Sequence, residues 1–345
     1  MHALILANGK GTNLRPLTVY TPRPIIPVIN KPLLIYQIEI LKRAGVNKIT
    51  LFLDYQPGKI EHILGSDEEL GVEMNYLVEE KPYGTAGAYK FANGFSEERT
   101  IVLNGDVLTD FAIARLIKEH EKSGSILSVS TVPRVSESEY GCLRINSDNR
   151  VTEYVSTPGA NGDEFGELLM NAGIYVVEPE VAGLISEQKT LTFRNDVFPR
   201  LAAENRGFFA FPIMEGYWQS IDTLESYLKV HLDFFAGKIL HFKPDKTQEF
   251  ERATSANIDS ASIIGADCVI KSGARIKNAV LGKGVQVEEG AKIENSVIWS
   301  HCRIASQANI NGALITSSCY IGKNSTISPG SVLGDKSSIS DYTKL

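Results

Sequence analysis

The chain has 345 residues, of which 43% are hydrophobic and 22% charged, an ordinary composition for a globular protein. Its formal net charge of −6 argues against a nucleic-acid-binding surface. No apolar run approaches the roughly 20 residues that would span a bilayer, so no membrane partner is expected. The N-terminus, Met1–Ala7, lacks the basic start and long apolar core of a signal peptide, and we expect a cytoplasmic protein.

The first two-thirds of the chain alternate strand and helix patterns. The runs Ala3–Ala7, Lys48–Leu53, Val72–Val78 and Thr100–Leu103 predict strands, and Pro32–Ala44 predicts an amphipathic helix. This alternation is typical of an α/β fold, with a Rossmann-like, mainly parallel sheet covered by helices on both faces. Ligands of such sheets bind beyond the carboxyl ends of the strands, so the loops after the first and last of these strands are the places to look for chemistry.

The pattern changes after Ala236. Residues 237–251 are polar and irregular and predict a linker between a first domain, residues 1–236, and a second, residues 252–345. In the second domain a branched apolar residue recurs every five or six positions, and two positions before it stands a small residue or a valine. This hexapeptide pattern predicts a left-handed parallel β-helix of about five coils. The apolar series is Ile258, Ile264, Ile270, Ile276, Leu281, Val287, Ile293, Ile298, Ile304, Ile310, Ile315, Ile321, Ile327, Leu333 and Ile339.

The cysteines point to packing rather than to metal or redox chemistry. The chain has four, Cys142, Cys268, Cys302 and Cys319, and no C-x-x-C pair, so neither a zinc site nor a disulfide framework is indicated. The last three occupy the small inward position of the hexapeptide pattern. We expect them to be buried as small apolar residues.

Several segments of the first domain follow one another as ordered motifs. Leu6–Thr18 reads LANGKGTNLRPLT, and it is followed by Pro27–Pro32, Pro82–Ala88, Asn104–Asp110, Asn171–Tyr175 and Gly216–Trp218. In this order they resemble the signature loop (A-G-G-x-G-T-R-L-R-P-L-T), the next block, the base-binding loop, the metal-binding strand end and two sugar-site blocks of the sugar-1-phosphate nucleotidyltransferases. With the β-helix the resemblance covers essentially the whole chain. It is closest to the mannose-1-phosphate guanylyltransferase (GDP-mannose pyrophosphorylase) branch.

The resemblance implies a reaction that joins a nucleoside triphosphate to a sugar 1-phosphate, giving a nucleotide sugar and pyrophosphate. Two polyanions must meet, so such a site needs cationic side chains and Mg²⁺. The resemblance assigns catalysis to Arg15 and Arg23, and the metal to Asp106 with Asp222 as a possible second ligand. The nucleotide-binding residues that it implies are Ala7, Asn8, Gly9, Gly11, Thr12, Asn13, Pro82, Gly84, Thr85 and Asp106. The sugar-binding residues that it implies are Asn171, Gly173, Tyr175 and Trp218.

The nucleotide side of this site departs from the family pattern at three positions. Asn8 stands where the family has glycine, and Asn13 replaces the arginine of the loop, which forfeits charge-assisted bonds to phosphate. Arg23 replaces the usual lysine, so the charge is kept with a different geometry.

The sugar and metal side departs as well. The family's F-x-E-K-P reads Tyr154–Pro158 here, so the sugar-phosphate lysine is Thr157. Arg194 stands where a glutamate is usual, and Ser220 replaces the second metal aspartate. Asp222 lies two residues beyond Ser220.

Three functions remain open from these residues. The first is a weakly active or inactive homologue that binds a nucleotide or nucleotide sugar and acts as a regulatory or assembly subunit. The second is a divergent, active nucleotidyltransferase in which Arg23 and Arg194 supply charge from new directions. The third is a hexapeptide acyltransferase, which would need His301, the one histidine of the repeat, as its base.

Structural roles compete with these assignments. The glycine loop could be a plain tight turn, Arg15 a structural ion-pair partner and Asp106 a turn aspartate that bonds its own backbone. His301 lies in an outward-turning stretch where a solvated role is expected. We expect the β-helix to mediate oligomerisation, either as a homo-oligomer or with an active paralogue.

Overall fold

The computed structural model describes residues 1–94, 98–133, 141–155, 168–186, 190–242, 244 and 246–345. The chain divides into two compact units, and each unit is made of two segments. Unit 1 comprises Met1–Gly9 and Leu34–Trp218, and unit 2 comprises Lys10–Leu33 and Gln219–Leu345. Within the described ranges, no helix combines the length and apolar character needed to cross a membrane.

Unit 1 is built on a nine-stranded sheet. Seven strands follow the order β10-β9-β11-β6-β1-β4-β5, while β8 pairs with β11 and β12 pairs with β8. Strand β1 lies between β6 and β4 and is parallel to both, and β4 is parallel to β5. These strands are β1 His2–Leu6, β4 Lys48–Leu53, β5 Glu73–Val78 and β6 Thr100–Asn104, which confirms the four predicted strands to within one residue at either end. All five residues of β1 are buried, as expected of a parallel strand that is covered on both faces.

The other half of this sheet is largely antiparallel, which the strand–helix alternation did not predict. Strand β11 runs antiparallel to β6, β8 and β9, whereas β12 and β8 are parallel. The remaining strands of unit 1 are β7 Val107–Thr109, β8 Leu127–Pro133, β9 Cys142–Ile145, β10 Val151–Val155, β11 Leu169–Val177 and β12 Phe208–Pro212.

The helices of unit 1 are amphipathic and present an apolar stripe to the sheet. In α5, Ile113, Leu116, Ile117 and His120 are buried at the spacing of one helical face. Helix α3 begins with a capping box between Ser66 and Glu69. The helices are α1 Leu33–Arg43, which confirms the predicted helix, α2 Pro57–Leu64, α3 Asp67–Leu70, α4 Gly84–Asn93, α5 Ile113–Ser123, η3 Pro179–Leu184, η4 Phe193–Val197 and α6 Phe198–Ala203.

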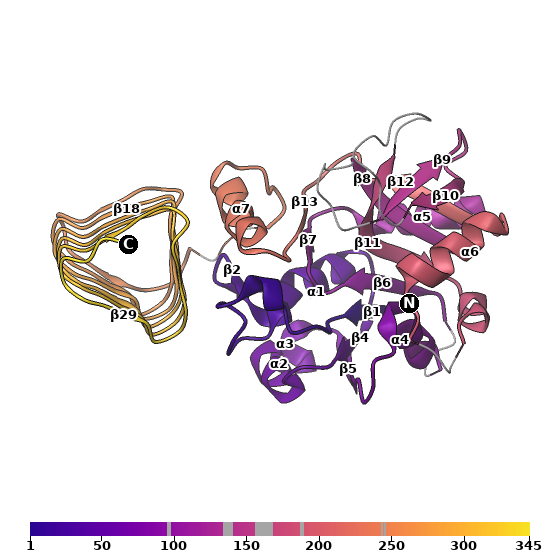
Figure 1. Ribbon diagram of the computed structural model, residues 1–345, viewed down its shortest axis with the longest axis horizontal. Helices are drawn as coiled ribbons and strands as arrows, with labels where there is room; N and C mark the ends of the chain where they lie inside the picture. Colours follow the sequence, from indigo (N-terminus) through magenta and orange to yellow (C-terminus); the bar gives the residue numbers. More distant parts are fainter. Residues whose placement is uncertain (95–97, 134–140, 156–167, 187–189, 243, 245) are drawn as a thin grey trace. The chain divides into compact units, whose positions relative to one another are not determined.

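Most of unit 2 is a parallel β-helix, visible in Figure 1 as a stack of coils between the labels β18 and β29. Its short strands form three parallel sheets of six, five and five strands. The axial apolar residues are buried, except Ile258 and Ile339 in the end coils, which are partly buried. Cys268, Cys302 and Cys319 are buried, as predicted.

The first strand of the β-helix is β14, Glu251–Arg252, where the Glu251 amide donates to the Cys268 carbonyl (2.8 Å). The later strands are β15 Asn257–Ile258, β16 Ile263–Ile264, β17 Val269–Ile270, β18 Arg275–Lys277, β19 Val280–Leu281, β20 Gln286–Val287, β21 Lys292–Glu294, β22 Val297–Ile298, β23 Arg303–Ile304, β24 Asn309–Asn311, β25 Leu314–Ile315, β26 Tyr320–Ile321, β27 Thr326–Ile327, β28 Val332–Leu333 and β29 Ser338–Ile339.

The N-terminal segment of unit 2 packs on the β-helix through a hairpin. Strands β2 Pro27–Val28 and β3 Lys31–Pro32 flank a turn at Ile29 and Asn30, and the Asn30 side-chain amide donates to the carbonyl of Leu281 (2.7 Å). Two 3-10 helices, η1 Thr12–Leu14 and η2 Arg23–Ile25, precede this hairpin. Strand β13, Trp218–Ser220, leads from unit 1 into the second segment.

Helix α7, Leu224–Phe235, connects the hairpin to the coils through a chain of hydrogen bonds. The indole N–H of Trp299 donates to the hydroxyl of Tyr227 (2.9 Å), which donates to the carbonyl of Pro27 (2.5 Å). One turn along α7, Nε2 of His231 accepts from the amide of Ile29 (3.2 Å). Tyr227 and His231 are completely buried, so this junction is a small core of its own.

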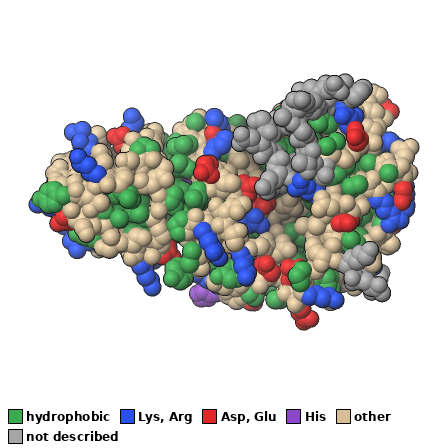
Figure 2. All heavy atoms as spheres, viewed as in Figure 1, with side chains coloured by type: hydrophobic (Ala, Val, Ile, Leu, Met, Phe, Trp, Pro, Cys, Tyr) green, Lys and Arg blue, Asp and Glu red, His purple; other side chains and the backbone are tan. Residues whose placement is uncertain are grey.

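The face of the molecule shown in Figure 2 carries charges of both signs. Lys and Arg side chains are interspersed with Asp and Glu, without a continuous basic area among the described residues of this face.

Candidate functional site

The candidate site lies at one edge of the unit 1 sheet, where its parallel strands end. The strand register pairs Leu6 of β1 with Phe52 of β4 and Asn104 of β6, and Phe52 with Leu77 of β5. The residues that follow these strands are therefore neighbours along a single edge. Three of them are carboxylates: Asp54 after β4, Glu79 after β5 and Asp106 just beyond β6.

The signature loop begins at this edge with Ala7, Asn8 and Gly9. The amide of Ala7 donates to the carbonyl of Phe52 (3.0 Å), which continues the β1–β4 pairing by one residue. The amide of Gly9 then donates to Oδ1 of Asp54 (2.9 Å). The side-chain amide of Asn8, where the family has glycine, lies 3.5 Å from Oε2 of Glu79.

Asp106 is held in place by the residue before it. The amide of Gly105 donates to the carbonyl of Leu6 (3.0 Å), and a Cβ at Gly105 would lie 2.7 Å from that oxygen and 2.8 Å from Cα of Ala7. Only glycine fits this close approach of two backbones. The half-buried carboxylate of Asp106 is thereby fixed beside the start of the signature loop.

The predicted base-binding loop, with Pro82, Gly84 and Thr85, is fastened to a segment far along the chain. The Thr190 hydroxyl donates to the carbonyl of Pro82 (2.7 Å), and the Phe193 amide donates to the hydroxyl of Thr85 (3.0 Å). The carbonyl of Leu191 accepts from the amide of Ala86 (3.0 Å). These bonds fix the loop at the start of α4. Because the Thr85 hydroxyl accepts one of them, this residue also has a structural role.

A cavity of about 570 Å³ lies beside this loop and along α4. The rings of Tyr83 and Phe91 line it with their centroids 5.2 Å apart, and Lys81 lies over the Tyr83 ring at 5.5 Å. An aromatic surface with a cation beside it suits a flat, anionic ligand.

The four predicted sugar-binding residues come together around a bulge in β11. The register between β11 and β8 shifts between Asn171 and Tyr175, and Gly173 lies at that shift. Oδ1 of Asn171 accepts from the amide of Gly173 (2.9 Å), and its side-chain amide donates to the hydroxyl of Tyr175 (3.0 Å). The indole of Trp218 donates to the carbonyl of Ala172 (2.8 Å). Asn171 and Tyr175 are buried, and burial raises the pKa of the Tyr175 phenol above its ordinary value.

Arg194 lies close to Tyr154, at the start of the segment that holds the sugar-phosphate lysine in the family pattern. Burial raises the pKa of Tyr154 to about 12, and the positive charge of Arg194 acts in the opposite direction. The sign reversal at position 194 therefore places a cation beside Tyr154, the first residue of that segment. Ser156, Thr157 and Pro158 themselves lie outside the described residues.

The rest of the signature loop belongs to unit 2. Thr12, Asn13 and Arg15 are exposed around η1, whereas Leu14 is fully buried and anchors that turn. The Thr18 hydroxyl donates to the carbonyl of Gly11 (2.6 Å).

Arg23 packs against the same loop. A Cβ at Gly11, which has a φ of 61°, would lie 3.0 Å from Cβ of Arg23, so glycine lets the arginine stem approach. The structure thus brings the stem of Arg23 to the signature loop, whereas Arg15 is exposed on unit 2.

The second predicted metal position is occupied by different chemistry. Ser220 is buried, and its short hydroxyl replaces a carboxylate. Asp222 stands just before α7, where its amide donates to Oγ of Ser226 (3.1 Å) and its Oδ1 lies 3.4 Å from the same atom. It therefore takes part in the capping of α7. Among the described residues, no group of three or more His, Cys, Asp or Glu side chains forms a metal cage.

Two carboxylates at the sheet edge were missed by the sequence analysis, Asp54 and Glu79. Each directly follows a predicted strand, so the rule that ligands bind beyond strand ends could have found them. The amide of Tyr83 donates to Oε1 of Glu79 (2.7 Å), which ties this carboxylate to the base-binding loop.

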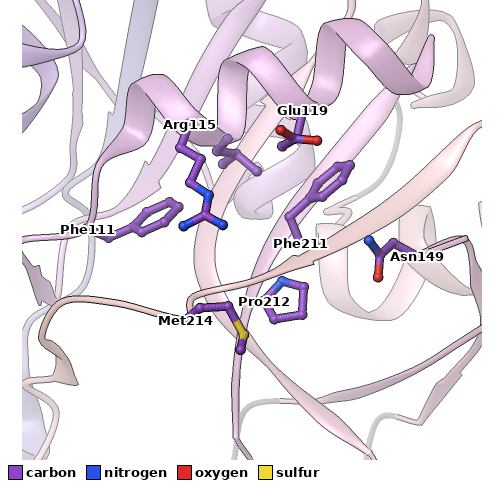
Figure 3. Close-up of a pocket in the computed structure, with 8 residues that line it drawn as sticks. Phe111, Arg115, Glu119, Asn149, Phe211, Pro212 and Met214 are labelled. Atoms are coloured by element: carbon purple, nitrogen blue, oxygen red, sulfur yellow. The ribbon is translucent and has the colours of Figure 1, made fainter. Parts of the chain in front are cut away.

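A second cavity of unit 1, of about 290 Å³, lies between α5 and β12. Figure 3 shows Arg115 and Glu119 on α5 facing Phe211, Pro212 and Met214 across it. None of its lining residues is a predicted site residue, and none lies at the strand ends described above.

Comparisons with known proteins agree with the architecture. Residues 2–236 match the family model described as Nucleotidyl transferase, and residues 245–345 match the EIF2B subunit epsilon LbH domain, a left-handed β-helix. The chain is 33% identical over 307 residues to "Probable mannose-1-phosphate guanylyltransferase 1" of Oryza sativa, covering 82% of either chain. It is 32% identical over 271 residues to "Mannose-1-phosphate guanyltransferase" of Saccharomyces cerevisiae, covering 76% of this chain and 71% of that protein.

Proposed function

This chain belongs to the nucleotidyl transferase family and is mannose-1-phosphate guanylyltransferase-like, and we propose that it binds a nucleoside triphosphate or nucleotide sugar with little or no turnover. In this proposal it serves as a regulatory or assembly subunit. The site would lie at the carboxyl ends of β1, β4, β5 and β6, with the base beside Pro82–Thr85 and the sugar beside Asn171–Tyr175.

The observation that carries the proposal is the neutral Asn13 in the exposed turn of the signature loop. A triphosphate needs a cation here, because donors that are fixed and charged bind phosphate about twice as strongly as neutral ones. Two observations about the metal site support the proposal. Position 220 is a serine where the family has the second metal aspartate, and Asp222 takes part in the capping of α7. Removal of one preorganised charged contact typically costs about 10²–10³ in rate.

The chain retains one carboxylate of the predicted metal pair. Mg²⁺ is commonly held by one or two carboxylates together with substrate phosphates and water, and Asp106 fits this demand at its fixed strand end. The ion, when bound, supplies neutralisation of phosphate charge. In unit 1, Arg194 would orient a ligand phosphate, and Gly9 would leave room for it. In unit 2, Arg23 and Gly11 would do the same at their part of the signature loop.

A direct test combines binding with turnover. Isothermal titration with GTP, ATP, UTP and dTTP in the presence of Mg²⁺ is expected to detect at least one nucleotide. Pyrophosphate release over a panel of sugar 1-phosphates that includes mannose 1-phosphate is expected to stay far below ordinary enzyme rates of roughly 1 s⁻¹. Faster, Mg²⁺-dependent turnover would contradict the proposal of little or no activity. It would instead establish a divergent, active nucleotidyltransferase, in which Arg194 supplies positive charge that other positions have lost.

Restoration of the missing arginine sharpens this test. Asn13 is exposed, so Asn13→Arg is not expected to disturb folding, and it should raise nucleotide affinity or turnover by about tenfold or more. Asn47→Arg, an equal charge change at an exposed position before β4, is the matched control and should change neither. If the two variants have equal nucleotide affinity and equal turnover, the residue at position 13 does not limit either quantity.

Two further properties are part of the proposal. The β-helix would mediate a homo-oligomer, or a hetero-oligomer with an active paralogue, and sedimentation as a strict monomer would contradict this. The acyltransferase alternative receives no support, because His301 is exposed at a corner of the coils with a φ of 61°.

A further inference from the structure

We propose that Asp54 is an internal competitor for phosphate, a carboxylate that occupies an anion-binding amide of the signature loop until a nucleotide displaces it. The inference rests on the proposed function, since it concerns the affinity of the same site. It identifies a residue that determines how strongly the site takes a polyanion.

The contact follows from strand register rather than from a chance surface encounter. Strand β1 pairs with β4 over its whole length, and the bond from the Ala7 amide to the Phe52 carbonyl extends the pairing past the end of β1. Gly9 and Asp54, which lie two residues beyond Ala7 and Phe52, are therefore neighbours. There the Gly9 amide donates to Oδ1 of Asp54 at 2.9 Å, the length of a full hydrogen bond.

The amide of Gly9 is the kind of donor that a glycine-rich loop offers to phosphate. Carboxylate and phosphate oxygens accept from the same donors with similar geometry. A nucleotide that uses this amide must first break its bond to Asp54. Because Asp54 is exposed, its carboxylate can swing out into water without being buried elsewhere.

Charge acts in the same direction as the hydrogen bond. Glu79 lies next along the edge, fixed by the amide of Tyr83 (2.7 Å), with the Asn8 side chain at 3.5 Å from its other oxygen. A phosphate that enters at Gly9 therefore meets the negative potential of two carboxylates. This repulsion is screened by salt, because the Debye length falls to about 3 Å at 1 M ionic strength.

The experiment measures the affinity of the full-length chain for two probes, GTP with Mg²⁺ and inorganic tripolyphosphate, by isothermal titration. Asp54→Asn removes the charge and keeps an acceptor, and Asp54→Ala removes both. We expect affinity for either probe to rise roughly fivefold in Asp54→Asn, the scale of one exposed charge interaction, and further in Asp54→Ala. The gain should shrink at high salt.

Glu61→Gln is the matched control. Glu61 is exposed on α2, so this variant makes the same change in net charge away from the loop, and its affinities should equal those of the parent chain. A readout that needs no ligand is the amide proton resonance of Gly9, which should shift in Asp54→Ala as the bond to a carboxylate is lost. An unshifted resonance would overturn the inference.

The outcomes separate this inference from the proposed function. If GTP binds the parent chain and its affinity is unchanged or lower in Asp54→Asn, Asp54 is not a competitor, and the proposed function stands. If GTP binds no variant while tripolyphosphate binds more tightly to Asp54→Asn, the nucleotide assignment fails and the competitor stands. If neither probe binds any variant, both are wrong.

Discussion

At the scale of single residues, the geometry of the candidate site depends on Gly105. This residue lets β6 and β1 approach so closely that the following carboxylate, Asp106, is fixed beside the signature loop. The atoms that a side chain at position 105 would meet belong to the backbone at the end of β1, which pairs with strands on both sides. They cannot move aside without disturbing the core.

We therefore expect Gly105→Ala to destabilise the fold by about 1–3 kcal/mol, the usual cost of overpacking, and to weaken nucleotide binding through displacement of Asp106. Urea denaturation and calorimetric titration would measure the two effects. Gly58→Ala in α2 is the control, because a Cβ there meets nothing within 4 Å. If both variants match the parent chain in stability, the close approach at Gly105 is not tight in solution.

Residue identity also explains why prediction of the site was incomplete. Only the resemblance to the family assigned Asn171, Gly173, Tyr175 and Trp218 to one sugar site, and in the structure these residues lie together around the bulge in β11. Asp54 and Glu79 were missed, because neither belongs to a motif and their importance comes from pairing between strands. The use of Asp222 in the capping of α7 depends on Ser226 and could not be read from the spacing to Ser220 alone.

At the scale of secondary-structure elements, α7 links the hairpin β2–β3 to the β-helix. The link is a relay of donors, in which Trp299 donates to Tyr227 and Tyr227 donates to Pro27. Buried polar groups of this kind are costly when one partner is removed. The relay is therefore a sensitive point for the stability of unit 2.

A double-mutant cycle can measure this relay. Trp299→Phe removes the indole donor and should cost about 1 kcal/mol. Tyr227→Phe should cost more, since it leaves the buried indole N–H without its acceptor and also removes the bond to Pro27. In the Tyr227→Phe background, Trp299→Phe should cost little or nothing, which corresponds to a coupling energy of about 1 kcal/mol in urea denaturation. Additive effects would show that the two rings do not share a hydrogen bond in solution.

His231 on the same helix predicts a pH dependence. Burial lowers its pKa from the ordinary 6.5 to about 4, and its Nε2 accepts from the Ile29 amide, so the folded chain holds it neutral. As pH falls below about 6.5, His231 takes up a proton in the unfolded chain but stays neutral in the folded chain. The free energy of unfolding should therefore decrease between pH 6.5 and about 4, by up to about 3 kcal/mol from this residue.

The measurement is urea denaturation at a series of pH values, with His231→Gln for comparison. Glutamine does not titrate in this range, so the variant should be less stable at neutral pH and lose less stability on acidification. Parallel pH profiles of the two proteins would contradict the assignment.

Elements were predicted better than their connections. The strands Lys48–Leu53 and Thr100–Asn104, the helix Leu33–Arg43 and the coils of the β-helix follow from local patterns of apolar residues, and these patterns are strong. The antiparallel strands around β11 could not be predicted in the same way, because pairing direction depends on contacts between segments far apart in sequence. The same holds for the backbone of residue 251, which pairs with Cys268 on the next coil.

At the scale of the whole molecule, each compact unit is assembled from two separate segments of the chain. Lys10–Leu33 and the segment from Gln219 to α7 form one compact unit with the β-helix. Part of the signature loop therefore shares a unit with the coils. A fragment that ends at residue 236 would lose the contacts of Asn30 with Leu281 and of Tyr227 with Trp299.

This predicts that a fragment of residues 1–236 unfolds at a lower urea concentration than the same residues in the full chain. Two lost hydrogen bonds alone account for about 2 kcal/mol, and exposure of the apolar side of α7 adds to this loss. A fragment of residues 245–345 should fold independently, since each coil of a repeat protein contacts chiefly its neighbours. Equal stability of residues 1–236 with and without the coils would show that the junction contributes nothing.

The composition of unit 2 from two distant segments has a consequence for synthesis on the ribosome. Residues 10–33 leave the exit tunnel well before the residues that they contact, including Tyr227, His231 and Leu281, have been translated. Until then the apolar side chains of this segment cannot make their final contacts. Folding of residues 10–33 is thus delayed until the coils have been translated. A nascent chain that stalls before the coils would leave the apolar side chains of this segment exposed to chaperones or to aggregation.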